Sequence, residues 1–558
     1  MKKTAFTRPL MGTLAAFALL LSSCGASGTA QTTAAQTAAG ISAEKSAGAE
    51  ESSSAAEGTA DSAAAEESEA AETKTFTAEE STLVTVTGGQ IEGSVEDGVY
   101  QYLGVPYAEA DELFTPASAV TPWDGVKEAV AYGSISYQSG NMGSSLTEAG
   151  PNESNNAQNL NIWTPGTDDA KRPVMVWLHG GGFSTGSANE DTYVGTNLAK
   201  SQDVVVVGVN HRLGVYGFLN LSKYGDKYRQ SANVGMLDIV DALKWVQDNI
   251  EAFGGDPANV TIFGESGGGA KVLTLMGSPY AKGLFEKAIM ESGATDTMGA
   301  VFTDEEVSEA IAEKTLENLG IAPEEVEKIQ DVSYGDLQQA ADQARADIAE
   351  EYKIPAMFGG YEYLWEPVVD GDFLPKEPVQ ENGFTDIAKD YPLLIGSNLN
   401  EWNIWMKDAL QHDVTDELTE AYKKAYPNED PSGAADVDML LRMPILRITA
   451  HKADQSEEGG APVYSYIFTK QLDDQGVYHG IEIPFVFDNS TDDPALASTV
   501  SSLWASFARD GVPSADGVET WEPYTRESGA VMILDDKTYL AHHHDEDLIR
   551  ILEPDYVW

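Results

Sequence analysis

The stretch that decides the fold is Val260-Thr-Ile-Phe-Gly-Glu-Ser-Gly-Gly268, which continues as an apolar segment to Met276. The apolar residues before Gly264 predict a buried strand, and those after Gly268 predict a helix. In the turn between them, small residues two positions before and after Ser266 allow the backbone to bend sharply and leave the serine hydroxyl exposed above the sheet. This order of strand, turn and helix is what a nucleophile elbow requires, so we expect Ser266 to be a nucleophile.

A second segment has the same spacing of glycine and serine. It is Gly182-Phe-Ser-Thr-Gly186, and the polar run Ser187-Ala-Asn-Glu-Asp191 follows it instead of an apolar helix. Because a nucleophile elbow needs the helix as well as the turn, Ser266 is favoured over Ser184.

A run of three glycines lies upstream, in His179-Gly-Gly-Gly-Phe183, directly after an apolar strand that ends at Leu178. Glycines leave backbone N–H groups unobstructed, as the stabilisation of an oxyanion in a tetrahedral intermediate requires. Taken alone, the run is better explained as a flexible loop. With a nucleophile elbow downstream, an oxyanion hole becomes the better explanation.

The rest of the chain alternates short apolar runs with helical patterns, which is typical of a mixed sheet with crossover helices. The predicted strands are Val174–Leu178, Val204–Val209, Val260–Phe263 and Leu393–Ile395, and the predicted helices are Asp238–Phe253 and Glu305–Leu319. Two early segments, Leu83–Thr87 and Tyr100–Gly104, predict a small N-terminal antiparallel sheet. We therefore expect an α/β fold with a large, mostly parallel central sheet flanked by helices.

Further motifs carry a family resemblance. They are Tyr102-Leu-Gly-Val-Pro-Tyr-Ala-Glu109, Asn210-His-Arg-Leu-Gly-Val-Tyr-Gly-Phe218, Phe253–Gly268, Ala281-Lys-Gly-Leu-Phe285 and Pro367-Val-Val-Asp-Gly371. With these motifs in this order, the sequence resembles the type-B carboxylesterases from Leu83 to nearly the C-terminus. The resemblance implies the α/β-hydrolase fold and hydrolysis of small carboxylic esters through an acyl-enzyme, without a metal or an organic cofactor.

The resemblance also implies a catalytic triad. The acid falls on Glu401, at the end of Gly396-Ser-Asn-Leu-Asn-Glu401, and the base on His479, in Tyr478-His-Gly-Ile-Glu-Ile-Pro-Phe485. Ser266, Glu401 and His479 then follow the order nucleophile, acid, base that α/β-hydrolases share. By the same resemblance, the N–H groups of Gly181, Gly182 and Gly267 are expected to form the oxyanion hole.

Other residues compete for these roles. Asp370 is an alternative acid, but Glu401 follows a predicted strand and is favoured. The consecutive His542, His543 and His544 suggest a metal site, although a solvated surface segment is the better interpretation. Trp402 stands directly after the predicted acid, where the family commonly has glycine, and it is expected either to narrow the substrate gorge or to pack against it.

The composition excludes nucleic acid as a partner. The chain has 34 Lys and Arg against 90 Asp and Glu, a net charge of −56, whereas phosphate binding requires clustered cations. We interpret this acidity as a well-solvated surface, in preference to a role in substrate choice. A salt-adapted source would also explain it. The sequence carries no signal for an oligomeric state.

The N-terminus has the features of a targeting segment. Basic residues at positions 2, 3 and 8 precede an apolar run from Leu10 to Leu21, which leads into Ser22-Ser-Cys-Gly25. This resembles a bacterial lipoprotein signal, which implies lipidation of Cys24, the chain's single cysteine. An ordinary signal peptide with a chance cysteine is the alternative.

Three regions follow from these patterns: a lipoprotein signal peptide at 1–23, a disordered Ala/Ser/Glu-rich tether at 24–78, and a catalytic domain at 79–558. We expect an extracytoplasmic protein held on a bacterial cell membrane by its N-terminal lipid. Two other functions use the same scaffold: a non-catalytic cell-surface binding protein, whose family members typically lose the nucleophile, and a lipase.

Overall fold

The computed structural model describes residues 75–138, 152–293, 302–356, 360–402, 413–427, 429–472 and 476–556. The chain divides at residue 68, and every described residue belongs to the second unit, 69–558. The predicted signal peptide, Cys24 and the tether up to residue 74 lie outside the described residues.

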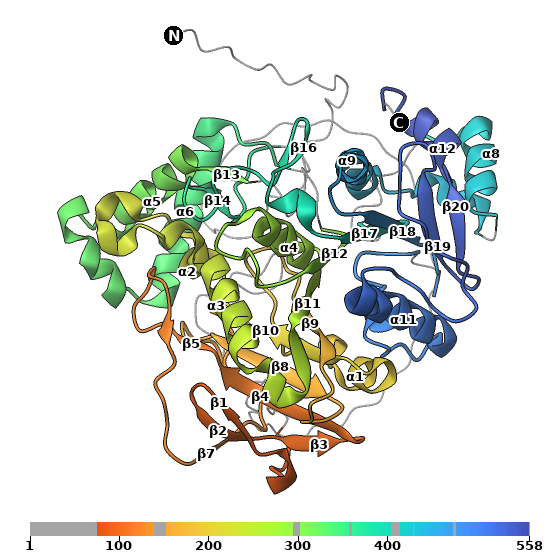
Figure 1. Ribbon diagram of the computed structural model, residues 1–558. Helices are drawn as coiled ribbons and strands as arrows, with labels where there is room; N and C mark the ends of the chain where they lie inside the picture. Colours follow the sequence, from red (N-terminus) through yellow and green to blue (C-terminus); the bar gives the residue numbers. More distant parts are fainter. Residues whose placement is uncertain are drawn as a thin grey trace, which may run out of the picture. The chain divides into compact units, whose positions relative to one another are not determined.

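A large mixed sheet forms the centre of the described unit (Figure 1). Its strand order is β20-β19-β18-β17-β12-β11-β9-β10-β8-β4-β3. The strands from β19 to β10 pair in parallel, and antiparallel strands flank them at both edges. The bounds are β3 (Ser94–Glu96), β4 (Val99–Pro106), β8 (Asn159–Thr164), β9 (Arg172–Leu178), β10 (Val205–Val209), β11 (Gly255–Glu265), β12 (Lys287–Glu291), β17 (Leu393–Asn398), β18 (Val463–Phe468), β19 (Ala530–Leu534) and β20 (Tyr539–His542).

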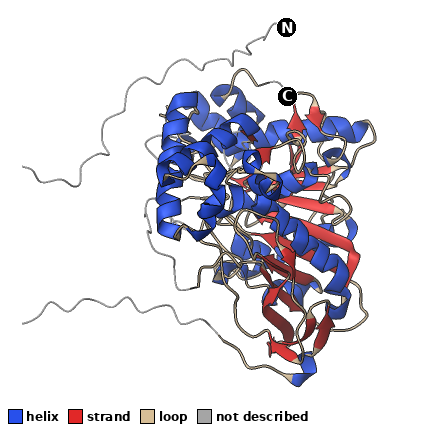
Figure 2. Ribbon diagram, turned by 90° about the vertical axis from the view of Figure 1, so that its left-hand side faces the viewer, coloured by secondary structure: helices blue, strands red, loops and turns tan. Residues whose placement is uncertain are grey.

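Both faces of this sheet are buried. Along β9, Val174, Val176 and Leu178 pack into one hydrophobic core, whereas Met175 and Trp177 pack into another. A strand that is covered on both faces needs apolar residues at every position, which is why it is a continuous apolar run in the sequence. Figure 2 shows the strands running through the unit as one twisted stack with helices packed against it.

Helices cover the two faces. The first core contains residues of α2 (Gly214–Phe218), α3 (Val234–Asn249), α4 (Gly267–Gly277), α5 (Glu305–Leu319), α6 (Tyr334–Tyr352) and α9 (Met439–Glu457). The second contains residues of α1 (Thr196–Gln202), α8 (Asp416–Ala425), α10 (Ile483–Val486), α11 (Pro494–Asp510) and α12 (Glu546–Leu552), with a further contribution from α9.

Four smaller sheets complete the unit. β1 (Val84–Val86), β2 (Gly89–Glu92) and β7 (Val126–Glu128) form a small N-terminal sheet, in which β1 and β2 pair antiparallel and β2 and β7 pair in parallel. The two-stranded sheets are β5 (Ala108–Glu109) with β6 (Ser118–Ala119), β13 (Thr303–Asp304) with β14 (Val368–Val369), and β15 (Val379–Gln380) with β16 (Gly383–Phe384).

The predicted fold class is confirmed, and the four predicted core strands correspond to β9, β10, β11 and β17. The helix predicted at 305–319 is α5, and the one predicted at 238–253 is α3 continued by a 3-10 turn, Ile250–Phe253. One assignment is wrong: Tyr100–Gly104 belongs to β4, which pairs with β8 in the main sheet and not with β1. Alternating hydrophobicity identifies a strand but does not say which sheet it joins.

The sheet brings the predicted site residues to one edge. β9, β11 and β17 run parallel, so their carboxyl ends lie at the same side, where open α/β sheets bind ligands. The glycine loop follows β9, Ser266 follows β11, and Glu401 lies three residues beyond β17.

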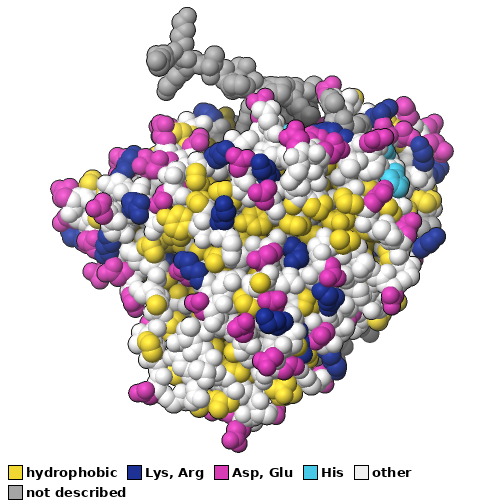
Figure 3. Space-filling model, viewed as in Figure 1, with side chains coloured by type: hydrophobic (Ala, Val, Ile, Leu, Met, Phe, Trp, Pro, Cys, Tyr) yellow, Lys and Arg dark blue, Asp and Glu magenta, His cyan; other side chains and the backbone are white. Residues whose placement is uncertain are grey.

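The surface carries the acidity. Acidic side chains are scattered over the visible face and are not gathered in one patch (Figure 3). Within the described residues, no helix is long and apolar enough to cross a bilayer.

Candidate active site

Ser266 occupies a strained turn between β11 and α4. Its φ of 55° and ψ of −124° lie outside the regions that a residue with a side chain prefers. A Cβ at Gly264 would lie 2.5 Å from the carbonyl oxygen of Leu178, and one at Gly268 would lie 1.9 Å from it, so both positions exclude any larger residue. The Ser266 N–H donates to the Glu291 carbonyl over 2.8 Å, which fixes the turn against β12.

His479 and Glu401 form a bonded pair. The Nδ1 atom of His479 lies 2.6 Å from Oε2 of Glu401, and the His479 backbone N–H donates to the Glu401 carbonyl over 2.9 Å. Oε1 of Glu401 accepts from the N–H of Asn398 over 2.7 Å. Burial raises the pKa of the Glu401 carboxyl well above its ordinary value, and nearby Asp438 adds to the shift. In the ionised form Glu401 accepts the Nδ1 proton of His479, which leaves a free lone pair on Nε2.

The second ring nitrogen of His479, Nε2, lies beside Glu265, the residue that precedes Ser266. Nε2 is 3.1 Å from Oε1 of Glu265, but the two atoms are not aligned for a hydrogen bond, and neither has a hydrogen-bond partner among the described residues. The Trp402 ring stacks on the imidazole, with centroids 4.3 Å apart and planes at 29°. Of the two roles expected for Trp402, the structure supports packing against the site.

The glycine loop offers free N–H groups. Gly181 and Gly182 have φ values of 81° and 61°, and Gly267 is the first residue of α4. In the described part of the chain, nothing accepts a hydrogen bond from the N–H of Gly181, Gly182 or Gly267. These are the three donors expected for an oxyanion hole.

The carbonyl groups of the same loop are all occupied. Lys271 Nζ donates to the carbonyls of His179 and Gly182, over 2.8 Å and 2.7 Å. The Gly180 carbonyl accepts from Nδ1 of His179 over 2.9 Å, and the Gly181 carbonyl accepts from N–H groups of the turn that follows. The loop therefore has its acceptors satisfied inside the protein and its donors free.

Three further carboxyls surround the His479–Glu401 pair. Burial raises the pKa of Glu265 to about 8, of Glu291 to about 8 and of Glu482 to about 7. Glu482 Oε2 accepts from the Asn398 amide over 2.6 Å, and Glu291 Oε1 accepts from the indole N–H of Trp504 over 2.9 Å. These contacts hold Glu482 and Glu291 in place, while burial favours the protonated forms of Glu265 and Glu291 at neutral pH.

Sequence reasoning did not single out Glu265, Glu482 or Lys271. Glu265 is the variable position of the Gly-x-Ser-x-Gly turn, and Glu482 stands three residues after His479 in the same motif. Lys271 is a cation inside the otherwise uncharged helix α4, every residue of which is buried. The sequence pattern that could have identified Lys271 is a single cation in an apolar helix, because a buried charged group must have polar partners.

The competing residues lie elsewhere. Ser184 follows the glycine loop in a turn, where its N–H donates to the Gly181 carbonyl, and no helix begins directly after it. Asp370 shapes a turn of its own: its carboxylate accepts from the Asn233 amide and from the N–H groups of Asp372 and Leu374. The structure therefore pairs His479 with Glu401 and not with Asp370.

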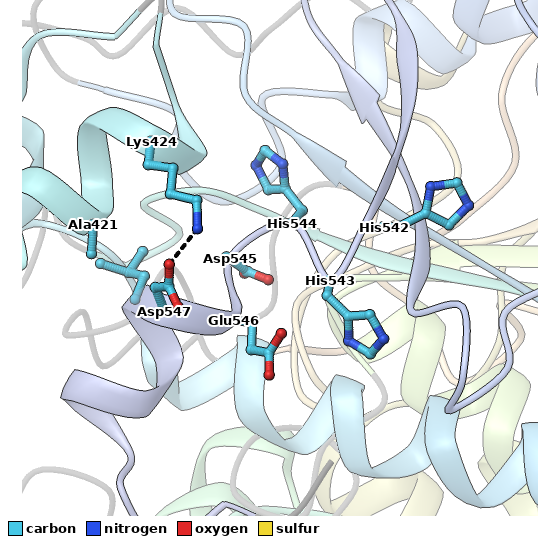
Figure 4. A pocket seen from close by; sticks show the side chains of 9 residues that line it. Ala421, Lys424, His542, His543, His544, Asp545, Glu546 and Asp547 are labelled. Carbon is cyan, nitrogen blue, oxygen red and sulfur yellow. Dashed lines mark hydrogen bonds and ion pairs between the residues drawn. The ribbon is translucent and has the colours of Figure 1, made fainter.

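The three consecutive histidines line a hollow of about 290 Å³ beside α8 and α12 (Figure 4). Their rings point in different directions (Figure 4), and His542 pairs with Glu522 over 2.5 Å. Within the described ranges, no group of three or more His, Cys, Asp or Glu side chains is arranged to hold a metal ion. The hollow shares no residue with the site around Ser266.

A mostly parallel sheet with a strained serine at the end of a central strand defines the α/β-hydrolases. Comparison with known proteins narrows this class. The family model described as "Carboxylesterase family" matches residues 80–437 and 407–549, so the chain belongs to the carboxylesterase family, type B, and is a carboxylic ester hydrolase. Non-catalytic family members typically lose the nucleophile, whereas this chain keeps Ser266, so the non-catalytic alternative is not retained.

Individual relatives support the same family assignment. Para-nitrobenzyl esterase of Bacillus subtilis (strain 168) is 36% identical over 505 residues, which cover 85% of this chain and 98% of the relative. Liver carboxylesterase 1 of Oryctolagus cuniculus is 31% identical, with 77% and 85% covered. Among solved structures, an esterase from anaerobic Clostridium hathewayi superposes with a TM-score of 0.75 at 33% identity. The superposition covers 86% of this chain and 99% of that enzyme, which can hydrolyze aliphatic aromatic polyesters.

Proposed function

We propose that the enzyme cleaves carboxylic esters through an acyl-enzyme on Ser266, with His479 as general base and Glu401 as its orienting acid. The observation that carries the proposal is the 2.6 Å contact between His479 Nδ1 and Glu401, at the same sheet edge as a serine in a strained turn. The contact leaves Nε2 as the basic atom, which is what proton removal from a serine hydroxyl requires.

Acylation begins when the Ser266 hydroxyl oxygen attacks the ester carbonyl carbon. His479 Nε2 takes the hydroxyl proton, and the carbonyl oxygen becomes an oxyanion that the N–H groups of Gly181, Gly182 and Gly267 bind. Collapse of this intermediate breaks the bond to the alcohol oxygen, which receives the proton from Nε2 and leaves as the alcohol.

Deacylation repeats the same steps with water. Nε2 takes a proton from water as its oxygen attacks the acyl carbon, and the proton then returns to the Ser266 oxygen when the acid departs. Glu401 stabilises the imidazolium that forms twice in each cycle. Only a neutral imidazole can accept a proton, so both halves of the cycle require the neutral form of His479.

The test is a panel of chromogenic esters, amides and thioesters, with an aliphatic aromatic polyester included because of the solved relative. Full-length enzyme is compared with Ser266→Ala and with the matched control Ser184→Ala. We expect ester cleavage that Ser266→Ala abolishes and Ser184→Ala retains. Loss of activity in Ser184→Ala alone would contradict the assignment.

The location is a separate part of the proposal. The lipobox-like Ser22-Ser-Cys-Gly25 supports lipidation of Cys24 and an extracytoplasmic enzyme anchored to a bacterial cell membrane. The full chain is expected in the membrane fraction and should incorporate a labelled fatty acid, whereas Cys24→Ser should be released or remain unprocessed. Lipid labelling that persists in Cys24→Ser would contradict the anchor.

A further inference from the structure

Lys271 is a buried lysine next to the proposed oxyanion hole. Its side chain is fully excluded from solvent on α4, five residues after Ser266. Its Nζ atom donates to the carbonyl of His179 over 2.8 Å and to that of Gly182 over 2.7 Å. A buried ammonium is costly unless such partners compensate for its lost hydration, so these two bonds determine where the amine can lie.

The two bonds join two parts of the oxyanion hole. The carbonyls that Lys271 binds lie at the beginning and the end of the glycine loop, whose N–H donors are those of Gly181 and Gly182. The third donor, Gly267, lies on the same helix as Lys271. A side chain anchored on α4 and bonded to both ends of the loop thus fixes the loop donors relative to the helix donor and to Ser266.

The groups that face Lys271 make its charge significant. Glu265, at the end of β11, is the carboxyl that acts on it electrostatically. The rings of His179 and His211, whose pKa values Lys271 affects, stack with centroids 5.1 Å apart. Burial, reinforced by Lys271 itself, lowers the pKa of both histidines, so they are neutral at ordinary pH. The Phe183 ring lies 5.3 Å from Nζ. The ammonium is therefore not paired with an exposed counter-ion, and its field extends through a poorly screened interior.

We propose that Lys271 is a positioning residue of the oxyanion hole, which locks the glycine loop onto the nucleophile helix and stabilises the oxyanion with its ammonium charge. This inference rests on the proposed roles of Ser266 and the three glycines. It adds to them a group that touches no reacting atom and acts through the loop it holds and through its charge.

The charge of Lys271 depends on pH in the range where the enzyme works. Burial lowers its pKa to about 7, and Glu265 opposes the shift. As pH rises through this value the amine loses its charge but keeps N–H groups for the two carbonyls. Loop position and oxyanion field can be separated by the variants below. Because burial also brings the pKa of Glu265 to about 8 and of Glu482 to about 7, the pH profile of Lys271→Gln, which keeps both carboxyls, is the reference for the wild type.

The experiment compares Lys271→Met, which removes donors and charge, with Lys271→Gln, which keeps a neutral donor. Lys452→Met is a matched control, because Lys452 is also fully buried, donates to a backbone carbonyl, lies 5.6 Å from a phenylalanine ring and has its pKa lowered by burial to about 7, but it sits on α9. Thermal unfolding of each protein is recorded with the kinetics.

Two readouts separate positioning from folding. One is the pair kcat and KM for a chromogenic ester. The other is the ratio of inhibition constants for a methyl ketone and the matching trifluoromethyl ketone, because the fluoroketone forms a tetrahedral adduct whose oxygen occupies the hole. We expect Lys271→Met to lower kcat by about 10- to 100-fold with little change in KM, and to lower the ketone ratio by a similar factor.

The control and the intermediate variant complete the expectation. Lys271→Gln should fall between wild type and Lys271→Met, and Lys452→Met should keep the wild-type kcat and ketone ratio. A Lys271→Met enzyme that keeps both values, or a loss shared equally by Lys452→Met, would overturn the inference.

The pH profile tests the charge itself. Above about pH 7 the wild-type enzyme should lose kcat/KM relative to Lys271→Gln, whose side chain does not titrate, and Lys452→Met should follow the wild type. The comparison with Lys271→Gln separates Lys271 from Glu265 and Glu482, because both proteins keep these two carboxyls. Absence of the decline in the wild type would overturn the electrostatic part.

Failure of this inference and failure of the proposed mechanism are distinguishable. If Ser266 reacts with an organophosphonate in wild type while Lys271→Met keeps full activity, the mechanism holds and the role of Lys271 falls. If Ser266 does not react in the wild type, the mechanism falls first, and the inference falls with it.

Discussion

Around His479 the buried ionisable groups are carboxyls, whereas around the glycine loop they are nitrogen bases. We call these the carboxyl cluster, which consists of Glu265, Glu291, Glu401 and Glu482, and the base cluster, which consists of Lys271, His179 and His211. Burial raises the pKa of every member of the first and lowers the pKa of every member of the second.

Both clusters therefore move toward neutral forms, by opposite proton changes. The comparison indicates how the site can stabilise the two charges that form during the reaction. The imidazolium forms beside the carboxyl cluster and the oxyanion forms beside the base cluster, so each new charge arises next to groups of complementary chemistry in a dry interior.

The largest effect is expected from His479, whose imidazolium Glu401 is proposed to stabilise. His479→Gln removes the base while keeping an amide near Glu401, and kcat should fall by at least about 10³-fold. The measurement is steady-state hydrolysis of a chromogenic ester, with His451→Gln on α9 as a matched control that keeps wild-type activity. An unchanged rate in His479→Gln would sink the assignment of the base.

Trp402 should have a smaller effect through the same imidazolium. Its ring stacks on His479 with centroids 4.3 Å apart, and an aromatic face attracts a cation by roughly 0.5–2 kcal/mol. Trp402→Leu should therefore lower kcat by roughly 2- to 30-fold. Trp123→Leu, in the segment before β7, serves as the control. A rise in KM at constant kcat would instead show that Trp402 shapes only the substrate pocket.

Glu291 should affect stability more than activity. Its pKa in the folded protein is about 8 against an ordinary value of 4.5, so the folded state holds the proton more tightly than the unfolded state does. The resulting stabilisation is complete below about pH 4.5 and is lost as pH rises through 8. Glu291→Gln cannot ionise, and its stability relative to wild type should rise by roughly 1–4 kcal/mol from pH 5 to pH 8. Denaturant unfolding at several pH values measures this, and a constant difference would refute it.

The smallest effect concerns substrate charge. With a net charge of −56, the chain should repel anionic esters at low ionic strength, and added salt should screen the repulsion. A neutral ester should be favoured over the matched dicarboxylate half-ester by a few-fold in kcat/KM, and the preference should narrow as salt increases. A preference for the anionic ester at low salt would indicate that the cation of the base cluster outweighs the global field.

Much of this molecule could be predicted from its sequence, for physical reasons that differ by element. The elbow at Ser266 and the strands β9, β10, β11 and β17 were predictable because their patterns are local: a turn with glycines two positions before and after the serine, and a short, mostly apolar run within each strand. The pairing of Glu401 with His479 depended on the family resemblance, since 78 residues separate them and no local pattern joins them.

The rest depends on three-dimensional packing. The place of Tyr100–Gly104 in the main sheet depends on its pairing with β8, which its own alternation does not encode. The link between Lys271 and the glycine loop spans 92 residues to His179 and 89 to Gly182. The sequence marks Lys271 as a charge among apolar residues, but only the fold identifies the carbonyls that hold it.

The central claim is that the acyl group is carried by Ser266, and covalent labelling tests it most directly. The full-length protein is treated with a fluorophosphonate, digested, and analysed by mass spectrometry with His479→Gln in parallel. The account predicts one modified residue, Ser266, in wild type and a strongly reduced yield in His479→Gln. Modification of Ser184 in place of Ser266, or equal labelling of Ser266 in His479→Gln, would contradict it.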